Sequence, residues 1–239
     1  MTFLTIPRSI WNAYFRSYLQ VVHRLSVTTA DYTLNTYSLS SAFFTPFIGW
    51  LIAATGRFKL VAYGGMPILL LGTALLIPFR TPGTDVGLIV MTQLFVGVGA
   101  GVWATCGVLA VMVPVTQQEV AAVMAVWGLF GSIGSSTGFA IAGALWNNML
   151  PEELANRWPG SANVTSAEVF ADLTVQIGLA DGTAERAALV GAYGHVQRIM
   201  VICGVALIPL CLLAIFIWKD VNIKKMEKEK GTQTKGNVF

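Results

Sequence analysis

The sequence predicts an all-α, polytopic membrane protein, and three of its features support that prediction. Of its 239 residues, 55% are hydrophobic and only 11% are charged. Its mean hydropathy of +0.66 lies above the range of soluble globular chains. Uncharged runs of about 20 residues recur along it, and a helix of that length crosses about 30 Å of hydrocarbon. The apolar helices of soluble proteins are shorter and amphipathic, so that class does not fit.

Five of these runs are long enough to be complete membrane spans. They are predicted at residues 35–54, 60–79, 86–113, 120–146 and 201–218. The runs divide the chain into a partial helix and loop at 1–34, four spans within 35–146, a long loop at 147–196, a last span within 197–218 and a tail at 219–239.

A sixth apolar segment lies near the start of the chain. IWNAYFRSYLQVV, from Ile10, is too short to cross a bilayer and contains Arg16. We interpret it as the second half of a helix. Either Arg16 faces a water-filled cavity or the segment does not span the membrane, and the sequence leaves both open. The opening MTFLTIPRSI lacks the basic start, apolar core and cleavage site of a secretory signal.

The positions of lysine and arginine predict which ends of the spans face the cytoplasm. Arg57 and Lys59 lie in one tight turn, and the tail 219–239 contains six lysines. Cytoplasmic segments retain positive charge, so both are placed in the cytoplasm. Alternation of the five spans then places RTPGTDVG and the loop 147–196 outside, and PVTQQE inside.

The loop 147–196 is acidic, whereas the tail is basic, and this contrast supports an outside position. It contains a glycosylation acceptor at Asn163, in Asn-Val-Thr. Thr165 and Glu168 have the spacing of a capping box. Three apolar residues follow at helical spacing: Phe170, Leu173 and Ile177. We expect a folded lid, and a solvated tether is the alternative.

Small residues follow helical spacing in two of the spans. The third span has Gly97 and Gly101 four residues apart, and the fourth has Gly128, Gly131, Gly134 and Gly138. Apolar side chains gain little by leaving lipid for each other, so membrane helices associate through close backbone approach at small residues. A groove for a neighbouring helix is the simplest interpretation, and a substrate channel is the sharper one. Both agree with a transporter, in which helices slide against each other at such grooves.

Several motifs carry a resemblance to a known family. In order they are NTYSLSSAFFTPFIGWLI followed by TGRFK, then LLGTALLIPFRTPGT, WGLFGSIGSSTGFAIAGALWNN, GAYGHVQR and the terminal EKEKGTQTKGNVF. Together they resemble the fungal siderophore-iron transporters of the major facilitator superfamily, from about Trp11 onward. The resemblance implies the carboxy-terminal half of a helical bundle, starting partway into its first helix.

This resemblance implies the transport of ferric siderophores of the hydroxamate type by proton-coupled symport. Alternating access needs two halves around a central site, so we expect a truncated half that is inactive alone and needs the missing amino-terminal bundle or a partner chain. The alternatives are half of a 14-span proton-drug antiporter and a non-transporting membrane fragment. The implied partners are the ferric siderophore, protons and the lipid bilayer, without nucleic acid. The plasma membrane is the expected location, with endosomal or vacuolar membranes as alternatives.

The sequence contains no motif that is typical of an enzyme active site. It has no paired-histidine metal spacing, no phosphate-binding glycine loop and no Ser/His/Asp arrangement. No cofactor or protein metal site is expected, because in this family the iron travels inside its chelate. None of the five spans has an acidic residue or histidine near its centre, so we expect the carboxylate for proton coupling outside this chain.

Two sets of residues are candidates for the transport site. Arg57 and Glu119 are predicted at the same cytoplasmic face, where a charge pair would latch an inward gate; two unrelated surface charges are the alternative. The candidates for substrate contact are aromatic or amide side chains, which suit a bulky and largely uncharged chelate: Tyr37, Phe44, Gln93, Trp103, Trp127, Asn147 and Tyr193. Trp146 and Trp218 are expected to be interfacial anchors.

Overall fold

The computed structural model describes residues 1–159 and 164–218, and all regular structure in these two ranges is helical. The helices are α1 (Thr2–Asn12), α2 (Phe15–Val22), α3 (Val27–Thr55), α4 (Phe58–Phe79), α5 (Val86–Met112), α6 (Val120–Arg157), α7 (Ser166–Ala171), α8 (Leu173–Gly178) and α9 (Ala184–Ile217). Within these ranges, α3, α4, α5, α6 and α9 are long and apolar enough to cross a membrane. The predicted all-α membrane fold with five spans is therefore confirmed.

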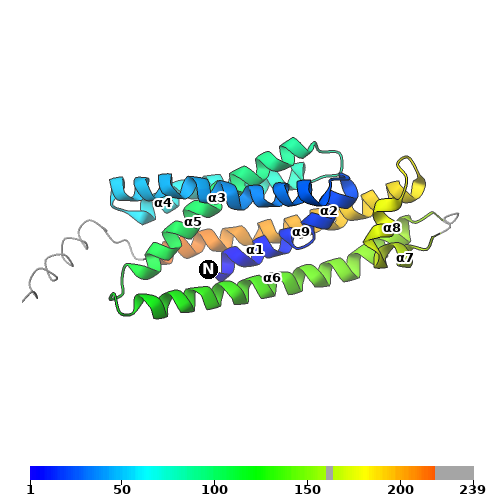
Figure 1. Ribbon diagram of the computed structural model, residues 1–239. Coiled ribbons are helices and arrows are strands. Elements are labelled where there is room, and N and C mark those ends of the chain that lie inside the picture. The colour runs from blue at the N-terminus through cyan, green and yellow to red at the C-terminus, as the bar shows by residue number, and fades with distance from the viewer. Residues whose placement is uncertain (160–163, 219–239) are drawn as a thin grey trace, which may run out of the picture.

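The long helices run side by side along one axis and define two ends of the bundle (Figure 1). The connections at 56–57 and 113–119 lie together at one end, which we call the turn end. The connection at 80–85 lies with α2, α7 and α8 at the other, which we call the loop end. Consecutive spans thus alternate in direction, as a chain that crosses a bilayer repeatedly must. The N-terminus lies partway along the bundle, beside α6 (Figure 1).

Close backbone approach at glycine holds the spans together. At Gly97 on α5, an added Cβ would lie 2.5 Å from the Tyr37 carbonyl oxygen of α3. At Gly101 it would lie 2.9 Å from Ser41 Oγ of the same helix. Residues with side chains do not fit at such distances, so α5 approaches α3 more closely than larger residues would allow.

The glycines of α6 have a different neighbour. Gly134 faces Thr2 and Thr5 of α1, and Gly138 faces Ile6 and Ser9, with an added Cβ only 2.6 Å from the Ile6 carbonyl oxygen. At Gly131 the nearest atom belongs to Met1. Gly128 has no such neighbour within 4 Å. The short helix α1 therefore packs closely against the glycine face of α6.

The predicted partial helix from Ile10 is two helices. The chain is already helical from Thr2, and a break at residues 13–14 separates α1 from α2. Arg16, on α2, forms an ion pair with Asp31 near the start of α3, with 2.7 Å between Nη2 and Oδ2. Both side chains are exposed at the loop end.

The predicted loop 147–196 is too long. α6 continues to Arg157 and α9 begins at Ala184, so only residues 158–183 connect them. Leu150 and Leu154 are fully buried, and Glu153 pairs with Arg157 one turn later. Apolar contacts on one face therefore extend α6 beyond the point where its sequence becomes polar. α9 begins at Ala184, before the predicted start of the last span at residue 201, and it buries Leu189 and Val196 in that stretch.

The predicted capping box is present, but the predicted apolar stripe is wrong. Thr165 and Glu168 exchange hydrogen bonds at the start of α7. Asp172 then ends α7 and caps α8, which breaks the helical spacing. As a result Leu173 and Ile177 are exposed, and Val169 and Gln176 are buried in their place.

Candidate functional site

A lone cation lies at mid-length of the bundle, on α1. The Arg8 guanidinium carbon is 4.4 Å from the centre of the Tyr37 ring on α3. The Arg8 side chain is exposed, whereas Ser9 and Ile10 beside it are buried. The ring face attracts the cation and partly offsets its poor solvation. Of the predicted substrate contacts, Tyr37 is the one that this cation meets.

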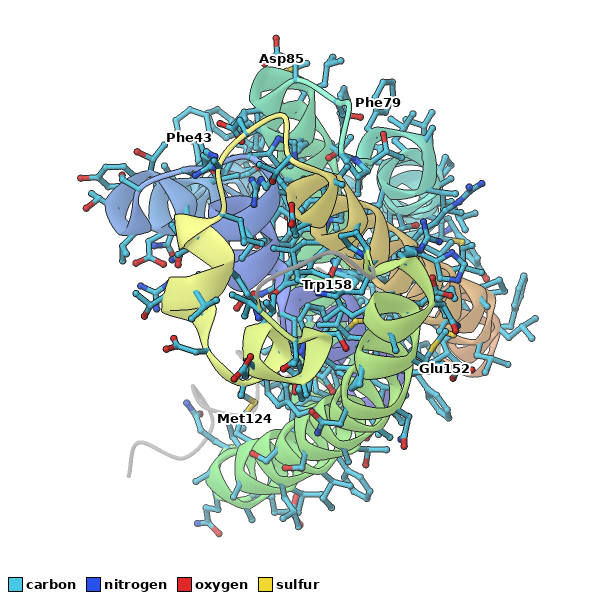
Figure 2. The ribbon with its side chains drawn as sticks, turned by 90° about the vertical axis from the view of Figure 1, so that its right-hand side faces the viewer. Phe43, Phe79, Asp85, Met124, Glu152 and Trp158 are labelled. Carbon is cyan, nitrogen blue, oxygen red and sulfur yellow. The ribbon has the colours of Figure 1, made fainter. Side chains whose placement is uncertain are left out.

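Exposed polar side chains occur on α3 and α6. Exposed polar residues on α3 are Asn35, Ser38 and Thr45, and on α6 Ser132 and Ser136 are exposed on the side away from the glycines that pack on α1. Figure 2 looks onto the loop end and shows α3 and α6 apart, with α7 and α8 between them and Phe43 directed outward from α3. A surface that meets only lipid tails gains nothing from such hydroxyl and amide groups. We call the exposed surface around Arg8 of α1 and Tyr37 of α3 the polar face.

The break between α1 and α2 frees a backbone acceptor. The Trp11 carbonyl oxygen accepts hydrogen bonds from Arg80 Nη1 at 2.6 Å and from Gln197 Nε2 at 3.0 Å. Arg80 is 1% exposed, and its guanidinium carbon lies 3.7 Å from the centre of the Phe15 ring. Burial lowers the pKa of Arg80 to about 9, so it stays charged at neutral pH. One carbonyl therefore joins α1 to the end of α4 and to α9.

Two arginines fasten the 158–183 connection to the end of α2. Arg24, whose φ of 51° is left-handed, pairs with Asp181 at 2.9 Å and donates to the Ile177 carbonyl. Arg186, which is 5% exposed, donates to the Val21 carbonyl and lies 3.4 Å from the same Asp181 carboxylate. Residues 164–183 of the connection are thus folded and docked at the loop end.

An aromatic and amide chain continues that docking into the bundle. The Tyr193 hydroxyl donates to Gln176 Oε1 on α8, and its ring meets Trp146 edge-on at 5.1 Å. Trp146 in turn stacks on Tyr14, in the break between α1 and α2, at 4.2 Å. Trp146 is only 6% exposed. The prediction that it is an interfacial anchor is wrong, because neighbouring aromatic rings on α9 and beside α1 cover it.

Comparison with known proteins identifies relatives. No family model matches the chain. The MFS siderochrome iron transporter 1 of Ajellomyces capsulatus is 54% identical over 215 residues, which are 90% of this chain and 38% of that protein. The chain is thus similar, along most of its length, to one part of the fungal siderophore-iron transporters. The MFS siderochrome iron transporter B of Aspergillus fumigatus is 41% identical over 226 residues, or 95% of this chain and 36% of the relative. Siderophore iron transporter 1 of Schizosaccharomyces pombe is 34% identical over 190 residues, or 80% and 31%. The chain spans about two fifths or less of these relatives' length.

The predicted substrate contacts do not converge on one cavity within the described residues. Gln93 and Trp103 are each 3% exposed within the bundle, and Trp103 packs edge-on against Trp218. The Trp127 ring lies against Gly107 of α5. Phe44 and Asn147 are exposed, and Phe44 sits among Phe43 and Phe47. Tyr193 is buried beneath α8. Tyr37 alone among the candidates lies against Arg8.

The predicted gate residues lie at the turn end without an ion pair between them. Glu119 Oε2 accepts from the Thr116 amide at 3.0 Å and from its hydroxyl at 2.8 Å, and these bonds lower the Glu119 pKa. Arg57 lines a surface pocket with Lys59 and Tyr63. Lys59 Nζ donates to the Trp218 carbonyl at the end of α9, at 2.6 Å. Both gate residues belong to the described part of the chain, where no salt bridge involves either.

Some sequence predictions have no counterpart in the structure. Asn163 and the tail 219–239 lie outside the described residues. Conversely, sequence analysis missed Arg8, Arg80 and Arg186. A charge inside the apolar stretch FLTIPRSIW was the available signal for Arg8. Arg80 and Arg186 flank spans, where an arginine normally reaches the membrane surface, so their burial had no signal.

Proposed function

We propose that this chain is the carboxy-terminal half of a proton-coupled transporter of ferric hydroxamate siderophores. The observation that carries the proposal is the similarity to named siderochrome and siderophore iron transporters along nearly the whole chain. The fold supports it, because five spans and a short first helix make one bundle. The polar face would form one wall of the substrate path.

The wall needs a second half opposite it. Transporters of this type bind substrate near the bilayer midplane between two repeats and expose the site alternately to each side. The described spans hold no acidic residue near mid-length, and His195 Nε2 of α9 lies 3.5 Å from Glu153 Oε1 near the end of α6, so the proton-coupling carboxylate would come from the other half. We therefore propose that the chain is inactive alone and works with an amino-terminal bundle.

The proposed orientation places the turn end in the cytoplasm and the loop end outside, in the plasma membrane. It follows from Arg57, Lys59 and the six tail lysines, since cytoplasmic segments retain positive charge. In this orientation the docked residues 164–183 would face the incoming siderophore. An external tag inserted at 160–163, reached by antibody in intact cells, tests the orientation.

Uptake of an iron-labelled hydroxamate siderophore by fungal cells that lack their own transporters tests the function. The cells express this chain alone or joined to the amino-terminal part of the Ajellomyces capsulatus relative. Uptake only in the joined protein is expected. Uptake by the chain alone would contradict the half-transporter proposal. No uptake in either case, despite delivery to the cell surface, would favour a non-transporting membrane fragment.

A further inference from the structure

Arg8 lies beside membrane-spanning helices, away from both ends of the bundle. Its partner Tyr37 is ten residues into α3 (Val27–Thr55), or about 15 Å along that helix. Ile6 and Ser9, which lie close to Arg8 on α1, contact Gly138 of α6. Gly138 is near the middle of that helix (Val120–Arg157). Tyr37 and Gly138 both lie away from the ends of helices that are long enough to cross a hydrocarbon core about 30 Å thick. A cation within the hydrocarbon core is stable only toward water, a partner or a ligand.

The packing of α1 leaves one side of the helix for Arg8. Ile6 and Ser9 face α6, where Gly138 receives them. Pro7 and Trp11 face α9, where they contact Gly204. Arg8 projects from the remaining side, toward Tyr37 of α3, and it is exposed. It therefore belongs to the polar face.

No carboxylate of the described residues neutralises Arg8. Helix α1 contains no acidic residue. The acidic residue of α3, Asp31, pairs with Arg16 at the loop end. The Tyr37 ring supplies only a weak quadrupole attraction. Arg80, the other cation inside the bundle, is bonded to Trp11 and covered by Phe15. Arg8 thus presents an unneutralised positive charge to the polar face.

We infer that Arg8 sets the charge class of the siderophore that this chain accepts. The inference rests on the proposed function. The five N–H donors of the Arg8 guanidinium suit the carbonyl and hydroxamate oxygens on the surface of a neutral or anionic ferric chelate. A chelate with a free ammonium group meets repulsion instead. At about 8–12 Å and an effective dielectric constant near 20, that repulsion lowers binding by roughly ten- to thirtyfold.

Two chelates with the same iron coordination isolate this charge. Ferrioxamine E is cyclic and neutral, whereas ferrioxamine B is linear and carries a free ammonium group. Equilibrium binding of each iron-labelled chelate is measured on membrane vesicles that carry the full chain, alone and joined to the amino-terminal part of the relative. We expect the wild-type protein to prefer ferrioxamine E by about tenfold or more.

Substitutions at Arg8 test whether the preference depends on the charge of the chelate or on its being cyclic rather than linear. Arg8→Gln should bring the preference for ferrioxamine E down by about tenfold, whereas Arg8→Lys, which keeps the charge, should retain most of it. Arg16→Gln is the matched control, because it removes an arginine of the same segment at the loop end, and it should leave the preference unchanged.

The outcomes distinguish this inference from the proposed function. Equal binding of both chelates by the wild-type protein, or a preference that Arg8→Gln does not change, would overturn the role of Arg8 and leave siderophore transport intact. The wild-type comparison needs no variant, so a poorly folding variant cannot block the test. Binding of neither chelate by the joined, correctly folded protein would overturn the proposed function, and the inference with it.

Discussion

Gly138→Ala tests whether close approach of α1 holds this half of the bundle together. The new Cβ would lie 2.6 Å from the Ile6 carbonyl oxygen and 2.6 Å from Ser9 Cβ, where ordinary contacts begin at 3.4 Å. α1 must therefore move away by about 0.8 Å, and overpacking of this kind costs about 1–3 kcal/mol. Alanine returns about 0.5–1 kcal/mol through its better helix propensity. We expect a net loss of about 1–2 kcal/mol in the free energy of unfolding.

Gly128→Ala is the matched control, because it lies on the same helix with nothing within 4 Å. It should gain about 0.5–1 kcal/mol from helix propensity alone. Denaturant unfolding of both variants in detergent micelles, followed by tryptophan fluorescence, measures the difference. If Gly138→Ala proves as stable as Gly128→Ala, α1 is not held by close packing on α6 and the reasoning fails.

Three further predictions concern the loop end and the turn end. Tyr193→Phe removes the donor to buried Gln176, so it should cost about 1–3 kcal/mol and speed proteolysis within 164–183; an unchanged cleavage rate would show that the bond does not hold the loop. Hydrogen bonds from Thr165 lower the Glu168 pKa below 4.5, so the α7 cap contributes stability above that pH and loses it as pH falls through the folded pKa. Hydrogen exchange of α7 should rise on acidification, and Glu168→Gln should flatten that response. In the joined protein, Glu119→Lys should abolish uptake and Arg57→Glu should restore it, whereas full uptake by Glu119→Ala would refute the latch.

The spans were predictable because hydrocarbon thickness sets a minimum apolar length, and the runs at 60–79 and 86–113 match α4 and α5 closely. Helix ends were not predictable from the same rule. α6 and α9 run beyond the predicted spans on contacts such as Leu154 and Leu189, which belong to tertiary packing rather than to local composition. The glycine faces could be recognised, but their neighbours could not, since helical spacing does not identify a partner helix.

The candidate site was harder to predict than the fold. An aromatic side chain within a span has the same sequence signature whether it faces a cavity or a neighbouring helix, so Trp103 and Tyr37 could not be separated. The structure buries the first against Trp218 and sets the second against Arg8. The charge of Arg8 was the stronger indication of a functional site, because a cation in an apolar membrane helix is energetically costly.

The carbonyl of Trp11 limits how this half can change shape. In an unbroken helix its oxygen would accept from the Phe15 amide, one turn later. Straightening α1 onto α2 would therefore take the acceptor away from Arg80 and Gln197, and strand two buried donors in an apolar interior. The bend between α1 and α2 therefore resists straightening. A change of shape in this part of the chain is thus expected elsewhere than at the break between α1 and α2.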